Sequence, residues 1–472
     1  MVFNSLVFLV FFVVVYGMYR VLPRRGQNAL IVISSYFFYG WWDWRFASLL
    51  AVTSLCSWLS GLHIDRYQQQ GRARAAWWVS FANIALNLGI LGFFKYFNFF
   101  VESFGDVLSA VGLGVSMPML RIVLPVGISF YTFQALSYSI DVYRGEMKPT
   151  RDWVAFFAFV SFFPQLVAGP IERARNLLPQ IERDRVIGSE DVWEGLRLVF
   201  WGLFKKVVVA DNLAVLVDGT FAVEGMSGGA ALMSVYAFAF QIFCDFSGYS
   251  DMARGLARMM DIDLMVNFRN PYFAKNPKEF WARWHISLST WLKDYIYIPL
   301  GGNRRGARRQ VANLWTTMLL GGLWHGAAWT FVIWGAFHGA LLSIYHLWSR
   351  RFLVKRAPDS GRWPWSRRIL MFHLACLGWV FFRAKGMGEV STVLSQIFTH
   401  FSWDLHASNM LTAMILLCTP LWLIQLLQER TGRTDAAAFL SLVPRAALYA
   451  LMAVMFLALA NTGGGAFIYF QF

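Results

Sequence analysis

Long apolar runs that alternate with clusters of arginine constrain this chain more than any other feature of its sequence. The first run covers residues 3–22 and leads into Arg24 and Arg25, and the runs at 29–42 and 46–62 lead into a second basic loop. About 20 apolar residues are needed to cross the hydrocarbon core of a bilayer as a helix. Loops rich in arginine and lysine usually lie on the cytoplasmic side. An even number of crossings separates the first two basic loops, so both fit that side.

The composition agrees with a chain that lies mostly within a membrane. Of the 472 residues, 57% are hydrophobic and only 15% are charged, whereas a soluble domain carries about 25% charged residues. The pattern predicts an all-α, polytopic, multi-pass integral membrane protein with about 11 transmembrane helices plus re-entrant segments. We expect a single domain over residues 1–472.

Two segments depart from this regular pattern. The apolar run at 153–168 is interrupted by Pro164, and it is either a crossing or a re-entrant hairpin, which membranes tolerate where protein or water covers the backbone. The run at 192–217 contains Lys205 and Lys206, and two lysines inside a helix predict that it enters obliquely or bends.

The longest polar stretch, residues 254–310, carries eleven basic and four acidic residues. This bias predicts a cytoplasmic or interfacial segment, and the next basic loop, 350–368, should lie on the same side for the same reason. The formal net charge of the chain is +15. In a membrane protein such an excess marks cytoplasmic loops, so we expect no nucleic-acid partner.

Between these two basic loops the chain must enter the membrane and return. Residues 313–323 are too short to cross as a helix, and Gly321, Gly322 and Gly326 are natural break points. His325, in the stretch GGLWHGAAW, is therefore expected where a short inner helix turns, at depth and beside a cavity.

Histidine at such a position has two interpretations. An ionisable residue within the membrane suggests a functional site, and an ordinary pKa of about 6.5 suits a general base. A buried histidine can equally be a hydrogen-bonded core residue, and composition leaves both interpretations of His325 open. His285 precedes it in RWHIS and His338 follows thirteen residues later. The other histidines are interpreted as structural: His63, His346, His373, His400 and His406.

The segment that begins at Asn267 mixes Asn-Pro turns, tryptophans, tyrosines and basic residues at short intervals. Aromatic side chains favour the headgroup region, and lysine and arginine reach phosphate from there. A membrane-surface anchor would explain most of this pattern, and the alternative is a mouth that gathers an anionic donor. The candidate donor-binding or substrate-binding residues are Asn267, Arg283, Trp284, Lys293, Asn303, Arg304 and Trp324.

Several other site classes lack their sequence signatures. The chain has no GxxxxGK[ST] phosphate loop, no GxSxG nucleophile elbow and no HExxH pair. Its histidines lack zinc-ligand spacing, and its four cysteines have no paired spacing. We therefore expect no metal, no bound cofactor, and neither ATP-driven transport nor a disulfide framework.

Together the motifs resemble those of a known family. They include NFRNPYFAKNPKEFWARWHISLSTWLKDYIYIPLGGNRRG, GGLWHGAAWTFVIWGAFHG, LPVGISFYTFQALSYSIDVYRG, FFPQLVAGPIERA and the ending FIYFQF. The chain resembles the membrane-bound O-acyltransferase family and, more narrowly, its bacterial alginate O-acetyltransferase-like branch, which acetylates polysaccharides. The resemblance implies a multi-helix fold around a central funnel in the bacterial inner (cytoplasmic) membrane.

The resemblance also implies site residues and partners. The essential histidine of the family falls on His325, and a second histidine falls on His285, where other branches carry Asn or Asp. The implied donor is acetyl-CoA in the cytosol. The acetyl group would pass to periplasmic acetyltransferase-like partner proteins that modify an exopolysaccharide, alginate- or cellulose-like.

The chemistry of a thioester fits this assignment. Because a thioester is already activated, the enzyme needs a base for the acceptor hydroxyl and donors for the developing oxyanion, not a nucleophile of its own. His325 would be the base, and His285, Trp324 or glycine amides could orient groups or stabilise charge. The basic residues of the 254–310 segment would attract the phosphates of coenzyme A.

Three other functions stay open at the level of sequence. One is a transporter or flippase that carries a polar or lipid-linked cargo in a polysaccharide export system. Another is D-alanyl transfer to teichoic acid, and a third is a scaffold subunit for polysaccharide secretion. Release of free coenzyme A thiol from acetyl-CoA separates a transferase from a transporter, and silent histidine variants would favour a scaffold.

Overall fold

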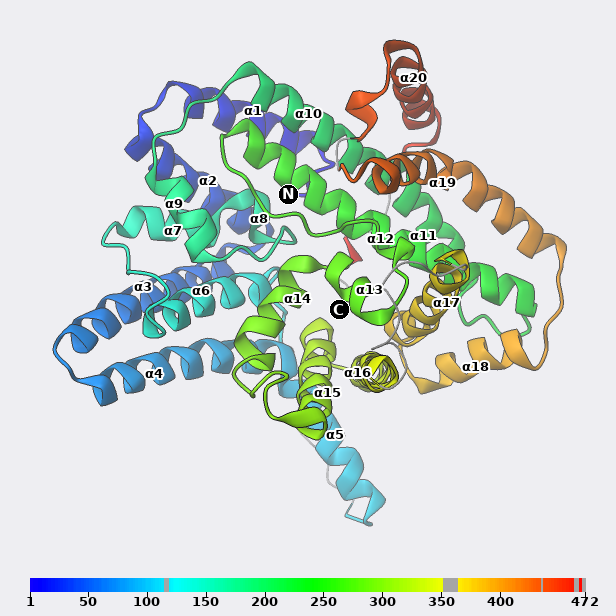
Figure 1. Ribbon diagram of the computed structural model, residues 1–472, viewed down its shortest axis with the longest axis horizontal. Coiled ribbons are helices and arrows are strands. Elements are labelled where there is room, and N and C mark those ends of the chain that lie inside the picture. Colours follow the sequence, from blue (N-terminus) through cyan, green and yellow to red (C-terminus); the bar gives the residue numbers. More distant parts are fainter. Residues whose placement is uncertain (114–118, 351–363, 434–435, 462–466, 469–472) are drawn as a thin grey trace. The chain divides into compact units, whose positions relative to one another are not determined.

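A computed structural model describes residues 1–113, 119–350, 364–433, 436–461 and 467–468 (Figure 1). The regular secondary structure of these residues is helical throughout, and it contains no strand. The expected all-α fold is confirmed.

The chain divides into two compact units. The first consists of Met1–Val199 with Ser250–Met265, and the second consists of Phe200–Tyr249 with Val266–Phe472. Two helices, α10 (Ser189–Leu203) and α12 (Gly228–Met259), contribute residues to both units. The expectation of a single domain over 1–472 stays a prediction.

Six helical stretches in the described residues are long and apolar enough to cross a membrane. The first, Arg24–Gln69, contains two helices, α2 (Arg24–Asp43) and α3 (Ala47–Gln69), each about 30 Å long or more. The shorter α1 (Leu6–Val21) is also apolar. The count of about 11 crossings stays a prediction. The other five stretches are Ala73–Ala110, Gly228–Met259, Trp329–Trp348, Leu405–Thr431 and Leu442–Leu459.

In the first unit, α6 (Ile128–Tyr143) is the most deeply buried of the long helices. It packs against α3, α4 (Ala73–Leu91) and α7 (Trp153–Ser161). The apolar run at 153–168 forms only the nine-residue α7 and the four-residue α8, separated by Phe162. Because nine residues extend about 14 Å, neither helix can cross a bilayer alone, which favours the re-entrant interpretation. The remaining helices of this unit are η1 (Trp44–Phe46), α4 (Ala73–Leu91), η2 (Gly92–Tyr96), α5 (Phe97–Ala110), α6 (Ile128–Tyr143), α7 (Trp153–Ser161), α8 (Phe163–Leu166) and α9 (Ala174–Glu182).

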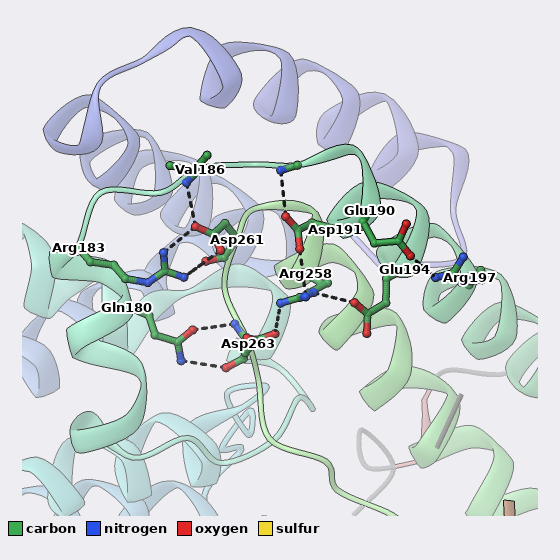
Figure 2. Close-up of polar contacts among 11 residues, drawn as sticks. Gln180, Arg183, Val186, Glu190, Asp191, Glu194, Arg197, Arg258, Asp261 and Asp263 are labelled. Atoms are coloured by element: carbon green, nitrogen blue, oxygen red, sulfur yellow. Dashed lines mark hydrogen bonds and ion pairs between the residues drawn. The ribbon is translucent and has the colours of Figure 1, made fainter. Parts of the chain in front are cut away.

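Figure 2 shows a polar network at the end of α12. Asp261 accepts two hydrogen bonds from the Arg183 guanidinium, at 2.7 and 2.9 Å, and one from the Val186 N–H at 2.9 Å. Partial burial raises the pKa of the Asp261 carboxyl, but these hydrogen bonds outweigh it, and the pKa lies below its ordinary value. Asp261 has a positive φ of 56°, a conformation that aspartate and asparagine tolerate best among residues other than glycine.

Arg258, on the last turn of α12, completes the network. It forms ion pairs with Asp191 at 3.1 Å, Glu194 at 3.0 Å and Asp263 at 2.8 Å (Figure 2). The side chain of Gln180 also exchanges hydrogen bonds with the Asp263 backbone. This network holds the chain on both sides of residue 185 against the end of α12.

In the second unit, α10 gives way to a π-helix, η3 (Phe204–Ala210), at the two lysines. The irregularity therefore lies where the sequence predicts it. Lys206 Nζ forms buried ion pairs with Asp211 at 2.7 Å and Asp245 at 2.6 Å, and Lys205 Nζ donates to Ser247 Oγ at 2.9 Å. A buried lysine is tolerated when carboxylates neutralise it, so this arrangement explains how two lysines fit inside a helix.

Two long helices of the second unit, α15 (Gly306–His325) and α16 (Trp329–Trp348), pack along each other. The expectation that Gly321 and Gly322 break a short inner helix is wrong, because α15 runs through both glycines to His325. A Cβ on Gly322 would lie 2.2 Å from the Phe331 carbonyl oxygen. Glycine is needed here for close approach of the two backbones, and not for a break.

The turn itself lies where the sequence predicts it. The helix ends at His325, and Gly326 follows with extended backbone before α16 begins. The remaining helices of the second unit are α11 (Asp211–Asp218), η4 (Pro271–Phe273), α13 (Pro277–Arg283), α14 (Ile286–Leu292), η5 (Lys293–Tyr297), α17 (Pro364–Arg383), α18 (Met387–Phe398), α19 (Leu405–Thr431), η7 (Ala436–Phe439) and α20 (Leu442–Leu459).

Replacing Gly322 with alanine should destabilise the protein by about 1–3 kcal/mol, because the added methyl group overlaps the Phe331 carbonyl oxygen. Gly89, within α4, has no atom within 4 Å of the position of its missing Cβ. Gly89→Ala should therefore be neutral or stabilise by up to about 1 kcal/mol. The melting temperatures of both variants in detergent check this, and equal melting temperatures would refute the packing argument.

Lowering the pH should weaken the contact between Asp261 and Arg183. A carboxyl with a depressed pKa stabilises the folded state above its unfolded pKa of about 3.9, and this contribution is lost as the pH falls through the folded value. We expect Asp261→Asn to lower the melting temperature at neutral pH and to reduce the loss of stability below about pH 4. Asn keeps the positive φ accessible. The control is Asp184→Asn, whose 3.7 Å pair with Arg24 is exposed and should contribute little.

Candidate active site

His325 is the last residue of α15, and its imidazole is buried among aromatic rings. The ring centroid lies 5.0 Å from that of Trp324, 4.9 Å from that of Trp334 and 5.2 Å from that of Phe382. These neighbours come from three helices, α15, α16 and α17. The imidazole at the end of the helix therefore lies in an aromatic interior. It is an ionisable group in surroundings of low dielectric constant.

The structure brings the second candidate histidine beside the first. His285 is fully buried between α13 and α14, and its ring centroid lies 6.3 Å from that of His325. The Phe246 ring packs on it edge to face at 4.6 Å, and the Trp324 ring lies 5.6 Å away. Two imidazoles that are forty residues apart in sequence therefore share one aromatic cluster.

The backbone at His285 is strained, with φ 42° and ψ 56°. A residue other than glycine pays about 1–2 kcal/mol for this left-handed conformation, and such strain persists only where the surroundings enforce it. Asn267 supplies much of this restraint. Its carbonyl oxygen accepts the Ile286 N–H at 2.9 Å, and its Oδ1 accepts from Ser287 N at 3.2 Å and Ser287 Oγ at 2.8 Å.

The buried aromatic candidate Trp284, next to His285, belongs to the wall of this cluster. Its ring lies 4.7 Å from that of Trp379 and 5.1 Å from that of Phe268. Trp324 contacts both histidines. Asn267 contacts the turn after His285, and this contact helps to position His285. Donor binding by Asn267 and by Trp284 stays a prediction.

The polar candidates lie in a different setting. Arg283 forms ion pairs with Glu279 at 2.7 Å and with Glu429, so its guanidinium already has two carboxylate partners. Lys293, Asn303 and Arg304 are exposed, whereas both histidines are buried. The structure therefore does not gather these four side chains around the histidines.

Helix α16 contributes two buried residues to this cluster, Trp334 and His338, that are not among the candidate site residues named from the sequence. Trp334 contacts His325, and His338, one turn further along the helix, contacts Trp334 at a centroid distance of 4.8 Å. Residues four apart share a helix face. The spacing of Trp334 and His338 in WGAFH was therefore a readable signal.

The chemistry available at this cluster is proton transfer and hydrogen bonding. Imidazole can take and return a proton near neutral pH, and a buried aromatic wall excludes water and strengthens polar interactions. No group of three or more His, Cys, Asp and Glu residues suited to a metal ion occurs in the described part of the chain. The paired histidines are the ionisable groups that such a site would use.

Comparison with known proteins finds a matching family and similar proteins that cover most of this chain. Residues 28–385 match the model of MBOAT, the membrane-bound O-acyltransferase family. The chain is 41% identical over 410 residues to the probable alginate O-acetylase AlgI of Pseudomonas putida, an alignment that covers 87% of this chain and 82% of that protein.

Two further relatives act on other polymers. The peptidoglycan O-acetyltransferase of Helicobacter pylori is 37% identical over 411 residues, which cover 80% of this chain and 75% of that protein. The teichoic acid D-alanyltransferase of Bacillus subtilis is 28% identical over 275 residues, which cover 55% of this chain and 69% of that protein. The matched family model extends over His285, His325 and the aromatic cluster around them.

Substituting Asn267 with alanine should reduce turnover by about 10-fold to 100-fold, because a shift of the His285 turn by about 1 Å is enough for such a loss. The matched control is Asn276→Ala. Asn276 caps α13 by accepting the Glu279 N–H at 2.9 Å, and its loss should cost about 1 kcal/mol of stability. If both variants lose turnover in proportion to their melting temperatures, Asn267 has no specific positioning role.

Proposed function

The chain belongs to the membrane-bound O-acyltransferase family, and on that premise we propose a specific acetyl-transfer reaction for it. The protein takes acetyl groups from acetyl-CoA at the cytoplasmic side of the bacterial inner membrane. It passes them to periplasmic acetyltransferase-like partner proteins, which O-acetylate an exopolysaccharide. The adjacency of two buried histidines, His285 and His325, is the observation that carries this proposal.

His325 acts as the general base in this mechanism. Its imidazole takes the proton of the acceptor hydroxyl as the hydroxyl oxygen attacks the thioester carbonyl carbon. The carbonyl electron pair moves onto oxygen, and the tetrahedral intermediate then collapses. The carbon–sulfur bond breaks, the coenzyme A thiolate takes the proton from the imidazolium, and the acetyl ester and free thiol are the products.

His285 supports this reaction from the neighbouring position. Its turn is fixed by Asn267 and its ring lies against Phe246, so its orientation is restrained. Such a restrained imidazole is suited to orient the acceptor or to hydrogen-bond the developing oxyanion. We assign it the first of these roles, orientation of the acceptor, with His325 as the base.

The donor phosphates require cations that are accessible from water. Lys293 and Arg304 meet this requirement because both are exposed, and Asn303 adds an amide between them in sequence. Arg283 fits a structural role better, since Glu279 and Glu429 already neutralise it. We therefore propose Lys293, Asn303 and Arg304 as the donor-binding residues among the seven candidates.

The relatives guide the choice of polymer. Those with about 40% identity over most of the chain are named as probable alginate O-acetylases, and the peptidoglycan O-acetyltransferase is somewhat less similar. We therefore propose a polysaccharide hydroxyl, alginate- or cellulose-like, as the final acceptor. Family membership supports an enzyme over a transporter or a scaffold, and the shorter match to the teichoic acid D-alanyltransferase makes D-alanyl transfer a weaker alternative.

His325→Ala should reduce acetyl transfer by about 100-fold to 10,000-fold, the usual contribution of a general base. Protein in liposomes receives labelled acetyl-CoA and an acceptor or partner, and both free thiol and labelled product are measured. His285→Ala should also be severely impaired. The control is His63→Ala, because His63 is exposed on α3 and its Nδ1 bonds the Leu59 carbonyl oxygen in its own helix.

Two outcomes would contradict the proposal. Full transfer by the His325→Ala variant would remove His325 from the mechanism. Absence of free thiol from the wild-type protein with donor and acceptor present would instead favour a transporter.

A further inference from the structure

His338 lies inside a cage of aromatic rings in the second unit. It is buried to 1% exposure on α16. The Phe280 ring stacks on it at a centroid distance of 6.0 Å and an angle of 6°, and the Trp281 and Trp334 rings meet it edge to face at 5.1 and 4.8 Å. Packing alone would place phenylalanine, not histidine, at such a position.

The polar atoms of this cage lack acceptors. Neither ring nitrogen of His338 has a hydrogen-bond partner among the described residues, and the same holds for the indole nitrogens of Trp281 and Trp334. A buried donor without a partner costs about 1–3 kcal/mol, and native proteins keep few of them. Three side chains of this kind in one cluster indicate that the cage binds a ligand that carries a hydrogen-bond acceptor.

One edge of the imidazole is already covered. A Cβ on Gly378 of α17 would lie 3.0 Å from His338 Nε2, so the glycine backbone packs directly against that nitrogen. His338 Nδ1 and the N–H groups of Trp281 and Trp334 are the groups that remain for a ligand.

The cage is connected to the histidine pair through one ring. The Trp334 centroid lies 4.9 Å from that of His325 and 4.8 Å from that of His338. The Trp334 ring thus contacts both the proposed base and His338. The wall around it is aromatic, which suits a small uncharged group better than a phosphate, because phosphate recognition needs cations.

We propose that His338, Trp334 and Trp281 form the subsite for the acetyl group of the donor, with their N–H groups hydrogen-bonded to its carbonyl oxygen. This inference rests on the proposed function. The aromatic rings pack around the acetyl methyl group. The donors stabilise the negative charge that moves onto the carbonyl oxygen when the acceptor hydroxyl attacks, and they release it when the thiolate departs.

His338→Phe tests the subsite, because it removes both nitrogens and keeps an aromatic ring of similar size. We expect kcat/KM for acetyl-CoA to fall by about 100-fold, as for the loss of an oxyanion donor, while the melting temperature stays equal or rises. Trp334→Phe should show the same direction of change. A purely structural histidine would give an active protein in the His338→Phe variant.

The matched control is His373→Phe. His373, on α17, is exposed, and its nitrogens bond the Tyr236 hydroxyl at 2.8 Å and the Ile369 carbonyl at 2.7 Å. This variant should keep its activity and lose some stability. The His338→Phe variant, in contrast, should lose activity and keep its stability. Equal loss of activity in both variants would overturn the subsite.

A binding measurement separates this inference from the proposed function. Equilibrium dialysis compares acetyl-CoA with coenzyme A on the wild-type, His325→Ala and His338→Phe proteins. The subsite requires that the wild-type and His325→Ala proteins prefer acetyl-CoA and that His338→Phe loses this preference. If the wild-type protein turns over acetyl-CoA but the preference is absent or survives in His338→Phe, the subsite is wrong. If the wild-type protein neither binds nor turns over acetyl-CoA, the proposed function itself fails.

Discussion

The candidate site depends on the close approach of α15 to α16. Gly322 lies against the Phe331 carbonyl, and Gly335 lies against the Met318 carbonyl, where an added Cβ would be 2.4 Å from that oxygen. Side chains at these points would force the two backbones apart. Because they are absent, the end of α15 and one face of α16 meet, and His325 packs on Trp334. The position of the proposed base is thus a consequence of backbone packing between two glycine-containing helices.

Sequence periodicity and charge were sufficient to predict the class of fold. Apolar runs of membrane length and basic loops led to an all-α membrane protein, and the described helices have this character. The turn after His325 was also predictable, since a short chain between two basic loops that are expected on the same side of the membrane must reverse. The glycines at 321 and 322 misled the prediction of a break, because glycine can permit close packing as well as end a helix. Only the neighbouring helix decides between these two effects.

The composition of the site was harder to predict. The pairing of His285 with His325 rests on the Asn267 contacts that fix a left-handed turn, and no local pattern specifies such a long-range restraint. The role of Arg283 depends on Glu429, 146 residues away. A charged residue in a basic segment looks like a donor-binding group until its partner is known. The relation of Trp334 to His338, in contrast, follows from a spacing of four residues on one helix.

Two buried polar clusters of the second unit, one around Lys206 and one around His338, differ in whether their polar atoms have partners within the protein. This difference separates a structural role from a functional one. Lys206 is matched by Asp211 and Asp245, so its charge is neutralised within the protein. His338 and Trp334 offer buried donors to aromatic rings that cannot accept them in the usual way. In the first cluster each charged group has a partner of opposite charge. The second is incomplete within the described chain, and it is one aromatic ring away from His325, where a carbonyl oxygen would complete it and react.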